Sequence, residues 1–417
     1  MTLVRLALKS LLSRRFTAGL TVFAIALSVA LFLGVEKLRT GARASFADTI
    51  SKTDLIMGAR SGSVQLLLYS VFRIGNATNN VSWQSYEELT SRPEVDWAVP
   101  ISLGDSHKQF RVMGTTAAYF DRYKYRNGRS LAFEQGVVFD DLFDAVIGAD
   151  VAQTLGYSVS DPIIVAHGLA SFTEHDELPF RISGVLEKTG TPADRTVFVG
   201  LGAIEAIHVD WQGGGRKSGP ATPEDVIRAM DLKPKAITAA MIGVKSRLQA
   251  FGLQRAINEY PDEPLQAILP GIALQELWEI VGVAETALTG VSAMVVATAL
   301  LGMAAMILSG LNERRREMAI LRSVGAGPLT IAGLLLTEAV TMAAAGAALG
   351  IGLLYVGLLV LRPWLDAAYG LYLPLSGLTQ KDAIMLGLVL AAAALVSLVP
   401  AIRAYRLSVA DGMMVKV

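Results

Sequence analysis

The chain has 417 residues and no formal net charge, because 37 basic side chains balance 37 acidic ones. Hydrophobic residues make up 52% of it and the mean hydropathy is +0.45, which is too apolar for a soluble protein of this length. The neutral balance argues against a nucleic-acid partner. The lack of cysteine excludes disulfides, thiolate metal sites and cysteine nucleophiles. The composition therefore predicts a membrane protein.

Residues 1–15 come before the first apolar run and include several basic side chains. Arg5 and Lys9 fall on one stripe of a helix, and Leu8 and Leu12 fall on another. This pattern predicts a cytoplasmic amphipathic helix on the inner membrane surface. The same charges also suit a simple positive-inside anchor, so both interpretations stay open.

Four apolar segments are long enough to span a bilayer. Lys and Arg are concentrated before the first segment, between the second and third, and after the fourth. The positive-inside rule then places both termini and the second-to-third link in the cytoplasm. The predicted order is transmembrane 1 at 16–35, a long helix with transmembrane 2 at 273–312, transmembrane 3 at 328–361, an outer loop at 362–382, transmembrane 4 at 383–402 and a cytoplasmic tail at 403–417.

The first apolar segment could alternatively be a cleaved signal peptide. Its basic start and the tripeptide Ala42-Arg43-Ala44 fit that interpretation. However, the apolar run is long for a signal peptide, and Glu36, Lys37 and Arg39 separate it from the tripeptide. We therefore expect a retained membrane anchor.

Residues 36–272 lie between the first two spans, and the topology places them outside the cytoplasm. Their length suits one or two compact domains. Mixed helix and strand patterns predict an α+β domain, with a smaller inserted lobe as an option. The predicted elements are a helix at 140–157, strands at 162–166, 180–186 and 196–199, a glycine-rich loop at 212–220, and a helix at 223–230 with Thr222 as N-cap.

The chain contains no convincing nucleotide-binding motif. Residues 213–218 resemble a phosphate loop, but Arg216 stands where that motif needs a glycine before Lys217. No Ser/His/Asp or paired-carboxylate arrangement indicates an enzyme. Any ATP hydrolysis is therefore expected on a separate subunit.

The helical pattern strengthens from Ala273 onward, and no proline interrupts the chain between Pro270 and Pro328. The second span is therefore predicted to be part of one helix longer than a bilayer is thick. Such a helix would tie the outer domain mechanically to the cytoplasmic link.

The link at 313–327 is rich in arginine and has the pattern of a short amphipathic helix. Met318, Leu321 and Val324 fall on one predicted face, away from Arg315 and Arg322. A rigid cytoplasmic helix between two spans is suited to act as a lever, which transmits the movement of a partner protein to the spans.

Two features of the third span invite a functional interpretation. Glu338 is its only charge, and a carboxylate inside a membrane span is a functional candidate, although an ion pair with Arg322 or Arg403 would also explain it. Gly346 and Gly350 form a Gly-x-x-x-Gly pair that suits helix–helix contact or dimerisation.

The residues 313–326 resemble the signature of FtsX-like permeases of the MacB/LolCDE class, the type VII ABC transporters. Residues 400–410 resemble the C-terminal pattern of that family, and Val146-Ile147-Gly148 and residues 182–186 resemble its MacB-like periplasmic core domain. The resemblance implies that the link is a coupling helix docked on an ATPase. The residues implied in coupling are Glu313, Arg314, Arg315, Arg316, Glu317, Leu321, Arg322 and Gly325.

The same resemblance implies partners and a mechanism. It implies a cytoplasmic ABC ATPase that binds ATP and Mg²⁺, a second permease subunit in a homodimer, and an accessory periplasmic protein, all at a bacterial inner membrane. ATP-driven movement would then work on the outer domain by mechanotransmission, exporting or extracting a hydrophobic, peptide or lipoprotein cargo. A non-transporting regulator or sensor of the same family is the alternative.

All four histidines fall in the outer domain, and several have acidic neighbours. Asp105 is near His107, and Asp176 follows His175. Imidazole and carboxylate suit zinc, so metal-linked transport is a second hypothesis, whereas ordinary surface histidines would need no metal. The candidate ligands are His107, His167, His175, Asp176 and His208.

Overall fold

The computed structural model describes residues 2–49, 52–126, 128–168, 178–212, 215–216, 220–313, 315–369 and 375–406. The chain forms two compact units, which we call the membrane unit and the outer domain. The membrane unit comprises Met1–Gly41, Gly282–Trp364 and Leu373–Val417, and the outer domain comprises Ala42–Val281 and Leu365–Tyr372.

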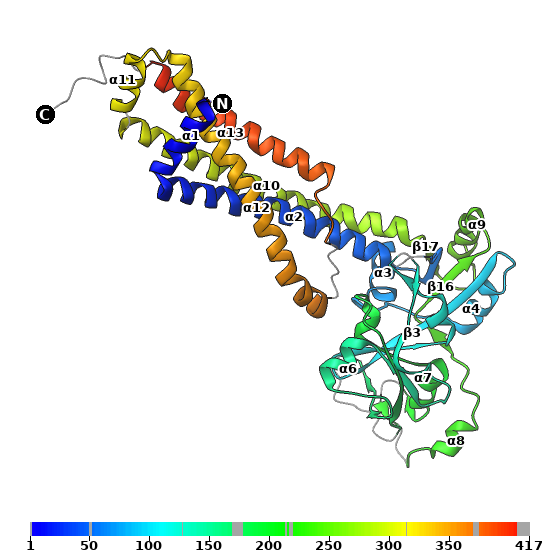
Figure 1. The fold of residues 1–417 in the computed structure, drawn as a ribbon. Coiled ribbons are helices and arrows are strands. Elements are labelled where there is room, and N and C mark those ends of the chain that lie inside the picture. The colour runs from blue at the N-terminus through cyan, green and yellow to red at the C-terminus, as the bar shows by residue number, and fades with distance from the viewer. Residues whose placement is uncertain are drawn as a thin grey trace. The chain divides into compact units, whose positions relative to one another are not determined.

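Long helices dominate the membrane unit (Figure 1). Four of those described are long and apolar enough to cross a membrane: Arg15–Ala47, Pro270–Leu311, Pro328–Leu365 and Gln380–Arg406. This confirms the four predicted spans. The helices are α1 (Thr2–Ser13), α2 (Arg15–Thr49), α10 (Pro270–Glu313), α11 (Arg315–Ser323), α12 (Pro328–Tyr369) and α13 (Gln380–Arg406).

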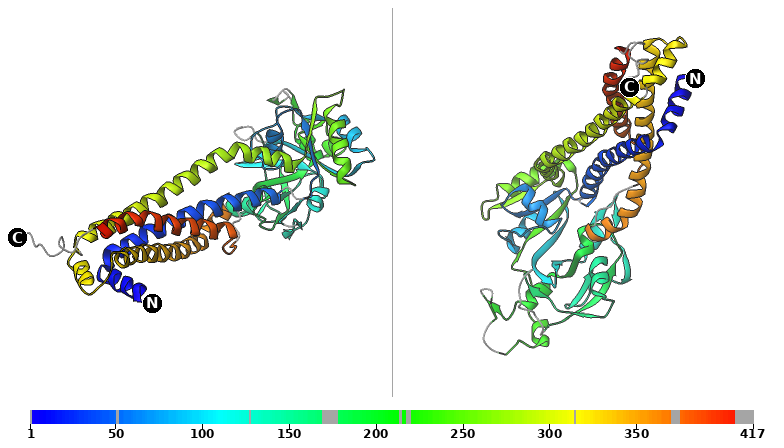
Figure 2. Two further views of the ribbon diagram at one scale, coloured as in Figure 1. Left: turned by 90° about the horizontal axis from the view of Figure 1, so that it is seen from above. Right: turned by 90° about the vertical axis from the view of Figure 1, so that its left-hand side faces the viewer.

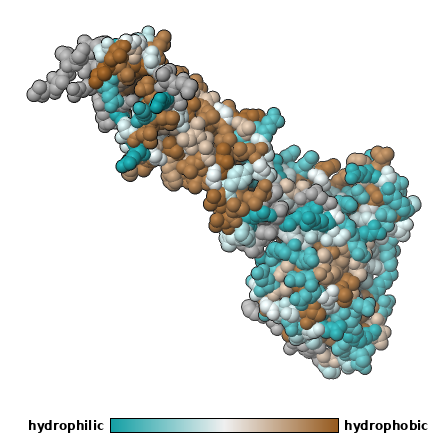
Figure 3. Space-filling model, viewed as in Figure 1, coloured by the Kyte–Doolittle hydropathy of each residue, from teal (hydrophilic) through white to brown (hydrophobic). Residues whose placement is uncertain are grey.

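The four spans pack around one apolar core. Leu33 of α2, Met303 of α10, Met342 of α12 and Val389 of α13 are buried together in it. Figure 2 shows these helices running alongside one another, and apolar side chains cover most of the visible surface of the unit (Figure 3). An apolar exterior over helices of this length is what a lipid environment requires.

The Gly-x-x-x-Gly pair of α12 is used inside the chain. A Cβ on Gly346 would lie 2.7 Å from the Ile25 Cγ2, and one on Gly350 would lie 2.6 Å from the Ala26 carbonyl oxygen. The two glycines therefore let α12 approach the backbone of α2 closely. Of the two roles the sequence left open, the structure shows helix–helix contact within one subunit.

The outer domain is built on a mixed sheet whose longest strand is β3 (Figure 1). The first half of β3 pairs antiparallel with β16, and its second half pairs antiparallel with β4. The long strand β3 therefore joins the two halves of the sheet. The strand order is β17-β1-β16-β3-β4-β12-β8-β11-β7, with β12 parallel to β4 and β11 parallel to β8. The strands of this sheet are β1 (Leu55–Ala59), β3 (Val95–His107), β4 (Phe110–Thr115), β7 (Phe133–Gly136), β8 (Asp144–Ile147), β9 (Pro162–Ile163), β10 (Ala166–His167), β11 (Phe180–Leu186), β12 (Thr196–Gly200), β16 (Ala239–Val244) and β17 (Leu265–Ile268).

Short helices and hairpins complete the domain and cover its cores. One core contains Phe110 and Phe180, another contains Leu55 and Leu253, and a third packs the Tyr119 ring against Phe198. The remaining elements are α3 (Ser63–Ser70), α4 (Trp83–Thr90), α5 (Ala118–Arg122), α6 (Ala149–Leu155), η1 (Pro192–Arg195), α7 (Leu201–Ile207), α8 (Glu224–Arg228), α9 (Arg247–Asn258), β2 (Val81–Ser82), β5 (Lys124–Tyr125), β6 (Arg129–Ser130), β13 (Trp211–Gln212), β14 (Gly215–Arg216) and β15 (Ala236–Ile237).

Three local predictions for this domain need correction. The predicted helix at 140–157 is strand β8 followed by α6, because β8 is fully buried between β11 and β12 and the sheet overrides its helical pattern. Thr222 does not cap α8; its hydroxyl donates to Asp210 Oδ1 at 2.7 Å, and Pro223 is the N-cap residue. The described part of the predicted loop at 212–220 includes the hairpin of β13 and β14.

Candidate functional site

The link between the second and third spans is the short helix α11. Met318 is buried at 9% exposure in the core of the membrane unit, whereas Ile320 is 56% exposed and Val324 is 82% exposed. The predicted apolar face therefore does not share one environment: Met318 is buried, Leu321 is half-buried and Val324 is exposed. One part anchors α11 to the spans, and Ile320 and Val324 leave an apolar patch on the surface.

Two further residues fix α11 in place. The Arg322 Nη2 donates to the backbone oxygens of Ala404 and Tyr405, both at 3.3 Å, near the C-terminal end of α13. A cation there also compensates the negative end of the helix dipole. Gly325 has φ +101°, a conformation that other residues rarely adopt, and it turns the chain toward α12.

The remaining predicted coupling residues are only partly described. Glu317 is exposed and Leu321 is half-buried. Arg314 lies outside the described residues, as do the side chains of Glu313, Arg315 and Arg316. The structure thus brings one predicted coupling residue, Arg322, into a contact within the membrane unit rather than onto the open surface.

Glu338 is buried within α12 at 4% exposure. It lies beside Ala339 and Met342, which belong to the core of the spans, and it has an interaction partner within the protein. A buried carboxylate inside a span requires such compensation.

A network of charges joins three of the spans, and sequence reasoning did not predict it. The Lys37 Nζ lies 2.9 Å from the Asp382 Oδ2, and the Lys381 Nζ lies 2.7 Å from the Glu36 Oε1. Arg39 pairs with Glu36 at 3.0 Å and approaches Glu285 of α10 at 3.9 Å. We call these six residues, Glu36, Lys37, Arg39, Glu285, Lys381 and Asp382, the span-end network. Their signal in the sequence was opposite charges directly after the first span and directly before the fourth.

The described histidines have partners within the protein. The His107 ring lies 2.6 Å from the Ile164 carbonyl oxygen through Nδ1 and 3.1 Å from the Tyr157 hydroxyl through Nε2. The His208 Nδ1 lies 2.6 Å from the Ile204 carbonyl oxygen. Contacts on both ring nitrogens of His107 favour a structural role for it.

Two of the predicted ligand positions do approach a buried carboxylate. The His208 Nε2 lies 3.6 Å from the Asp105 Oδ1, and the strand register places His167 opposite Asp105. The side chain of His167 lies outside the described residues, as do His175 and Asp176. Among the residues that the structure describes, no three His, Asp or Glu side chains are arranged to hold a metal ion.

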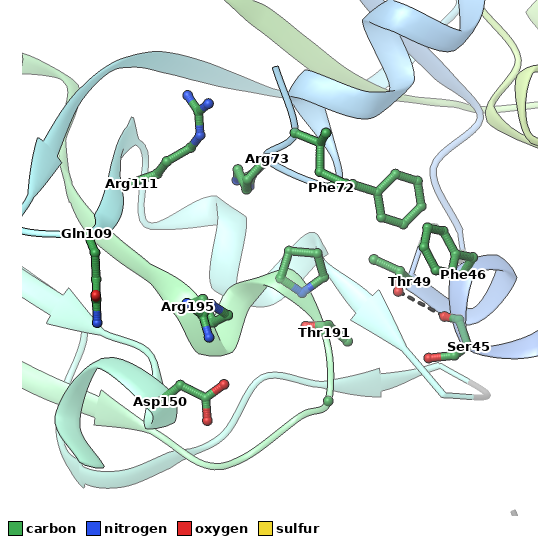
Figure 4. Close-up of a pocket in the computed structure, with 13 residues that line it drawn as sticks. Ser45, Phe46, Thr49, Phe72, Arg73, Gln109, Arg111, Asp150, Thr191 and Arg195 are labelled. Carbon is green, nitrogen blue, oxygen red and sulfur yellow. Dashed lines mark hydrogen bonds between the residues drawn. The ribbon is translucent and has the colours of Figure 1, made fainter. Parts of the chain in front are cut away.

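The outer domain also contains a cavity of about 400 Å³ that sequence reasoning did not predict (Figure 4). Phe46 and Phe72 form one wall, with ring centroids 4.6 Å apart. Arg73, Arg111 and Arg195 also line it. We call this cavity the arginine pocket. No sequence signal marks it, because its residues come from five segments, namely α2, the loop after α3, the start of β4, α6, and η1 with the residues before it.

Two family models match the chain. The MacB-like periplasmic core domain matches residues 18–251, which is more than half of the chain, and the FtsX-like permease C-terminal domain matches residues 289–409. The chain belongs to the FtsX/MacB-type ABC permeases. The second match contains α11 and the last two spans, so the permease carries both the outer domain and the membrane part of this family.

Solved structures of two transporter domains match part of the permease. The periplasmic region of MacB from Actinobacillus actinomycetemcomitans matches at 11% identity and a TM-score of 0.33, covering 56% of this chain and 97% of that one. The extracellular domain of the noncanonic ABC-type transporter YknZ from Gram-positive bacteria matches at 14% identity and a TM-score of 0.30, covering 52% and 99%. No curated protein matches the permease.

Proposed function

We propose that this permease transmits the movements of a cytoplasmic ABC ATPase to its outer domain, with α11 as the coupling helix. The observation that carries the proposal is the apolar patch of Ile320 and Val324 on a helix that is otherwise anchored. A lever must be attached firmly at one side and must offer a contact surface at the other. Met318 and Arg322 provide the attachment, and the exposed patch provides the surface.

In this proposal, both termini and α11 face the cytoplasm of a bacterial cell, and the ATP and Mg²⁺ bind to the partner subunit. Two copies of the permease pair with two ATPase subunits, and an accessory periplasmic protein can extend the system. The cargo is hydrophobic, peptide or lipoprotein in character. A regulator or sensor that moves no cargo would use the same coupling.

The test is to place a charge on the patch. Val324→Asp and Ile320→Asp should each reduce the ATP hydrolysis that the co-expressed ATPase shows in complex with the permease by tenfold or more, because a buried unpaired carboxylate at an interface costs several kcal/mol, or about 2–5. Co-purification of the two subunits should weaken in parallel.

The matched control is Val137→Asp, which changes another exposed valine, 66% accessible, in the outer domain. It should leave both ATPase activity and co-purification unchanged. Wild-type coupling in both link variants would reject α11 as the coupling helix.

Zinc-linked transport is retained as a second proposal on one specific observation, the approach of His208 and the His167 position to Asp105. Two imidazoles and a carboxylate are a ligand set that zinc accepts. Calorimetric titration of the full chain with zinc tests it. Binding that His208→Ala abolishes supports the proposal, and absence of binding rejects it.

A further inference from the structure

The arginine pocket lies wholly within the outer domain and has two chemically different walls. Phe46 and Phe72 are on one side of the cavity, and Arg73, Arg111 and Arg195 are on the other (Figure 4). The volume of about 400 Å³ is within the range of cavities that bind small molecules. An apolar wall facing a cationic wall fits a molecule with an apolar part and an anionic head.

The three guanidinium groups are not neutralised by the protein. None of them forms an ion pair with a described carboxylate. Arg111 donates to the Asn76 Oδ1 at 3.0 Å, Arg195 lies over the Phe110 ring at 5.4 Å, and Arg73 reaches the Tyr119 hydroxyl at 3.5 Å. All these partners are neutral, so the positive charge stays available.

The acidic residue that lines the cavity does not neutralise these arginines. Asp150 is buried and forms its ion pair with Lys188, which is not among the lining residues. Its Oδ1 is held by Lys188, whereas its Oδ2 is buried without a hydrogen-bond partner. The remaining polar lining includes Gln109, whose side-chain amide can donate hydrogen bonds to an anion.

The basic wall is also electrostatically unfavourable as it stands. Burial lowers the pKa of Arg111, and the positive charge of Arg73 lowers it further. Arg73 has φ +60°, an unfavourable conformation for a residue with a side chain, and its Nε is buried without a hydrogen-bond partner. Backbone strain of this kind is found preferentially at active sites and ligand-binding sites.

We propose that the arginine pocket binds an amphiphilic anion, with a phosphate or carboxylate head on the arginines and an apolar chain against Phe46 and Phe72. Arginine suits this head because its planar group donates two parallel hydrogen bonds to such an anion. The two phenyl rings, which are tilted by 40° to each other, exclude water from the chain. The site is a property of the outer domain and does not depend on ATPase coupling.

The experiment uses the full chain in phosphatidylcholine nanodiscs and hexyl phosphate as the probe, measured by calorimetry. Hexyl phosphate should bind at least tenfold more tightly than inorganic phosphate or hexanol, because only it contacts both walls. Arg111→Gln and Arg195→Gln should each weaken its binding about tenfold, since each removes a charge-assisted contact.

Matched variants separate the two walls. Arg247→Gln, at an exposed arginine on α9 away from the cavity, should leave binding unchanged. Phe72→Ala should weaken hexyl phosphate but not inorganic phosphate. The proposal is overturned if hexyl phosphate binds no better than phosphate, or if the pocket variants, shown to be folded by their melting temperatures, bind as the control does.

One further arm distinguishes the source of the anion. When phosphatidylglycerol replaces part of the nanodisc lipid, tenfold weaker binding of hexyl phosphate would assign the pocket to an anionic lipid headgroup. Unchanged binding would assign it to an amphiphile that is free in the aqueous space. Both results support an amphiphilic anion as the ligand class.

Discussion

The span-end network of the membrane unit and the arginine pocket of the outer domain treat charge in opposite ways. In the membrane unit, Lys37 and Asp382 are 9% and 2% exposed and satisfy each other at 2.9 Å. In the outer domain, Arg111 loses solvation beside another arginine and finds only a neutral partner. A closed network compensates its own charges, whereas an open cluster of like charge is the arrangement that the proposed anionic ligand would compensate.

The two units also pack by different means. In the membrane unit, α12 approaches α2 through Gly346 and Gly350, since lipid offers no hydrophobic force to drive helices together and close backbone contact is favoured instead. The outer domain instead buries large rings such as Tyr119 and Phe198 in a conventional core. Substitutions should therefore have different consequences in the two units, and four predictions test this from the largest expected effect to the smallest.

Gly350→Val should have the largest effect. Its Cβ would lie 2.6 Å from the Ala26 carbonyl oxygen and 3.0 Å from the Val29 Cβ, and a backbone cannot yield as a flexible side chain does. We expect a loss of about 3 kcal/mol or more, seen as a lower melting temperature in detergent. Gly352→Val is the control, since a Cβ there meets nothing within 4 Å. Equal melting temperatures for the two variants would disprove the close approach of α12 to α2.

Lys37→Met should also be strongly destabilising, by about 3–5 kcal/mol, because it leaves the Asp382 carboxylate buried without its cation. The double variant Lys37→Met with Asp382→Asn should recover much of that loss. The asparagine can still accept the hydrogen bond that the Thr379 amide donates to Asp382 at 2.8 Å. Thermal unfolding of both variants tests this prediction. If the double variant is no more stable than Lys37→Met, the pairing of Lys37 with Asp382 does not explain the loss of stability.

Arg111→Gln should change the stability of the ligand-free protein by less than about 1 kcal/mol. The lost hydrogen bond to Asn76 is offset by relief from the charge of Arg73. The free energies of unfolding of Arg111→Gln and Lys37→Met should therefore be measured side by side. A loss as large as that of Lys37→Met would show that the arginine pocket, like the span-end network, is structural.

The smallest effect should come from a surface pair of the outer domain. Both Arg228 Nη atoms lie 2.9 Å from the Asp141 carboxylate, and this hydrogen bonding lowers the pKa of Asp141 below its ordinary 3.8. The pair therefore stabilises the fold above pH 3.8, and the contribution is lost as the pH falls through the lowered pKa. Exposed pairs contribute about 0.2–1 kcal/mol.

Asp141→Asn should remove that part of the acid sensitivity. Melting temperatures at pH 5 and pH 3 should differ less in this variant than in the wild type. An identical difference in both proteins would assign the acid sensitivity to other carboxylates.

Membrane organisation was predictable because its signals are local in the sequence. Uninterrupted apolar runs identify the four spans, and the absence of proline after Pro270 predicts the continuous helix α10, which has 44 residues. The link motif at 313–326 indicates the family by its residues alone. Short strands were less predictable: β11 was expected over its exact range, whereas β8 was mistaken for helix because its burial comes from neighbours distant in sequence.

The sequence by itself determined the four spans, the link and the family, since hydrophobic length and charge act within single segments of the chain. Only the tertiary structure decided which charges meet and which cavities form. Glu36 and Lys381 are separated by 345 positions yet bond at 2.7 Å, and the arginine pocket takes its residues from five separate segments. The types of two side chains determine how strongly they can interact. The packing of the spans and strands determines whether they are close enough to do so.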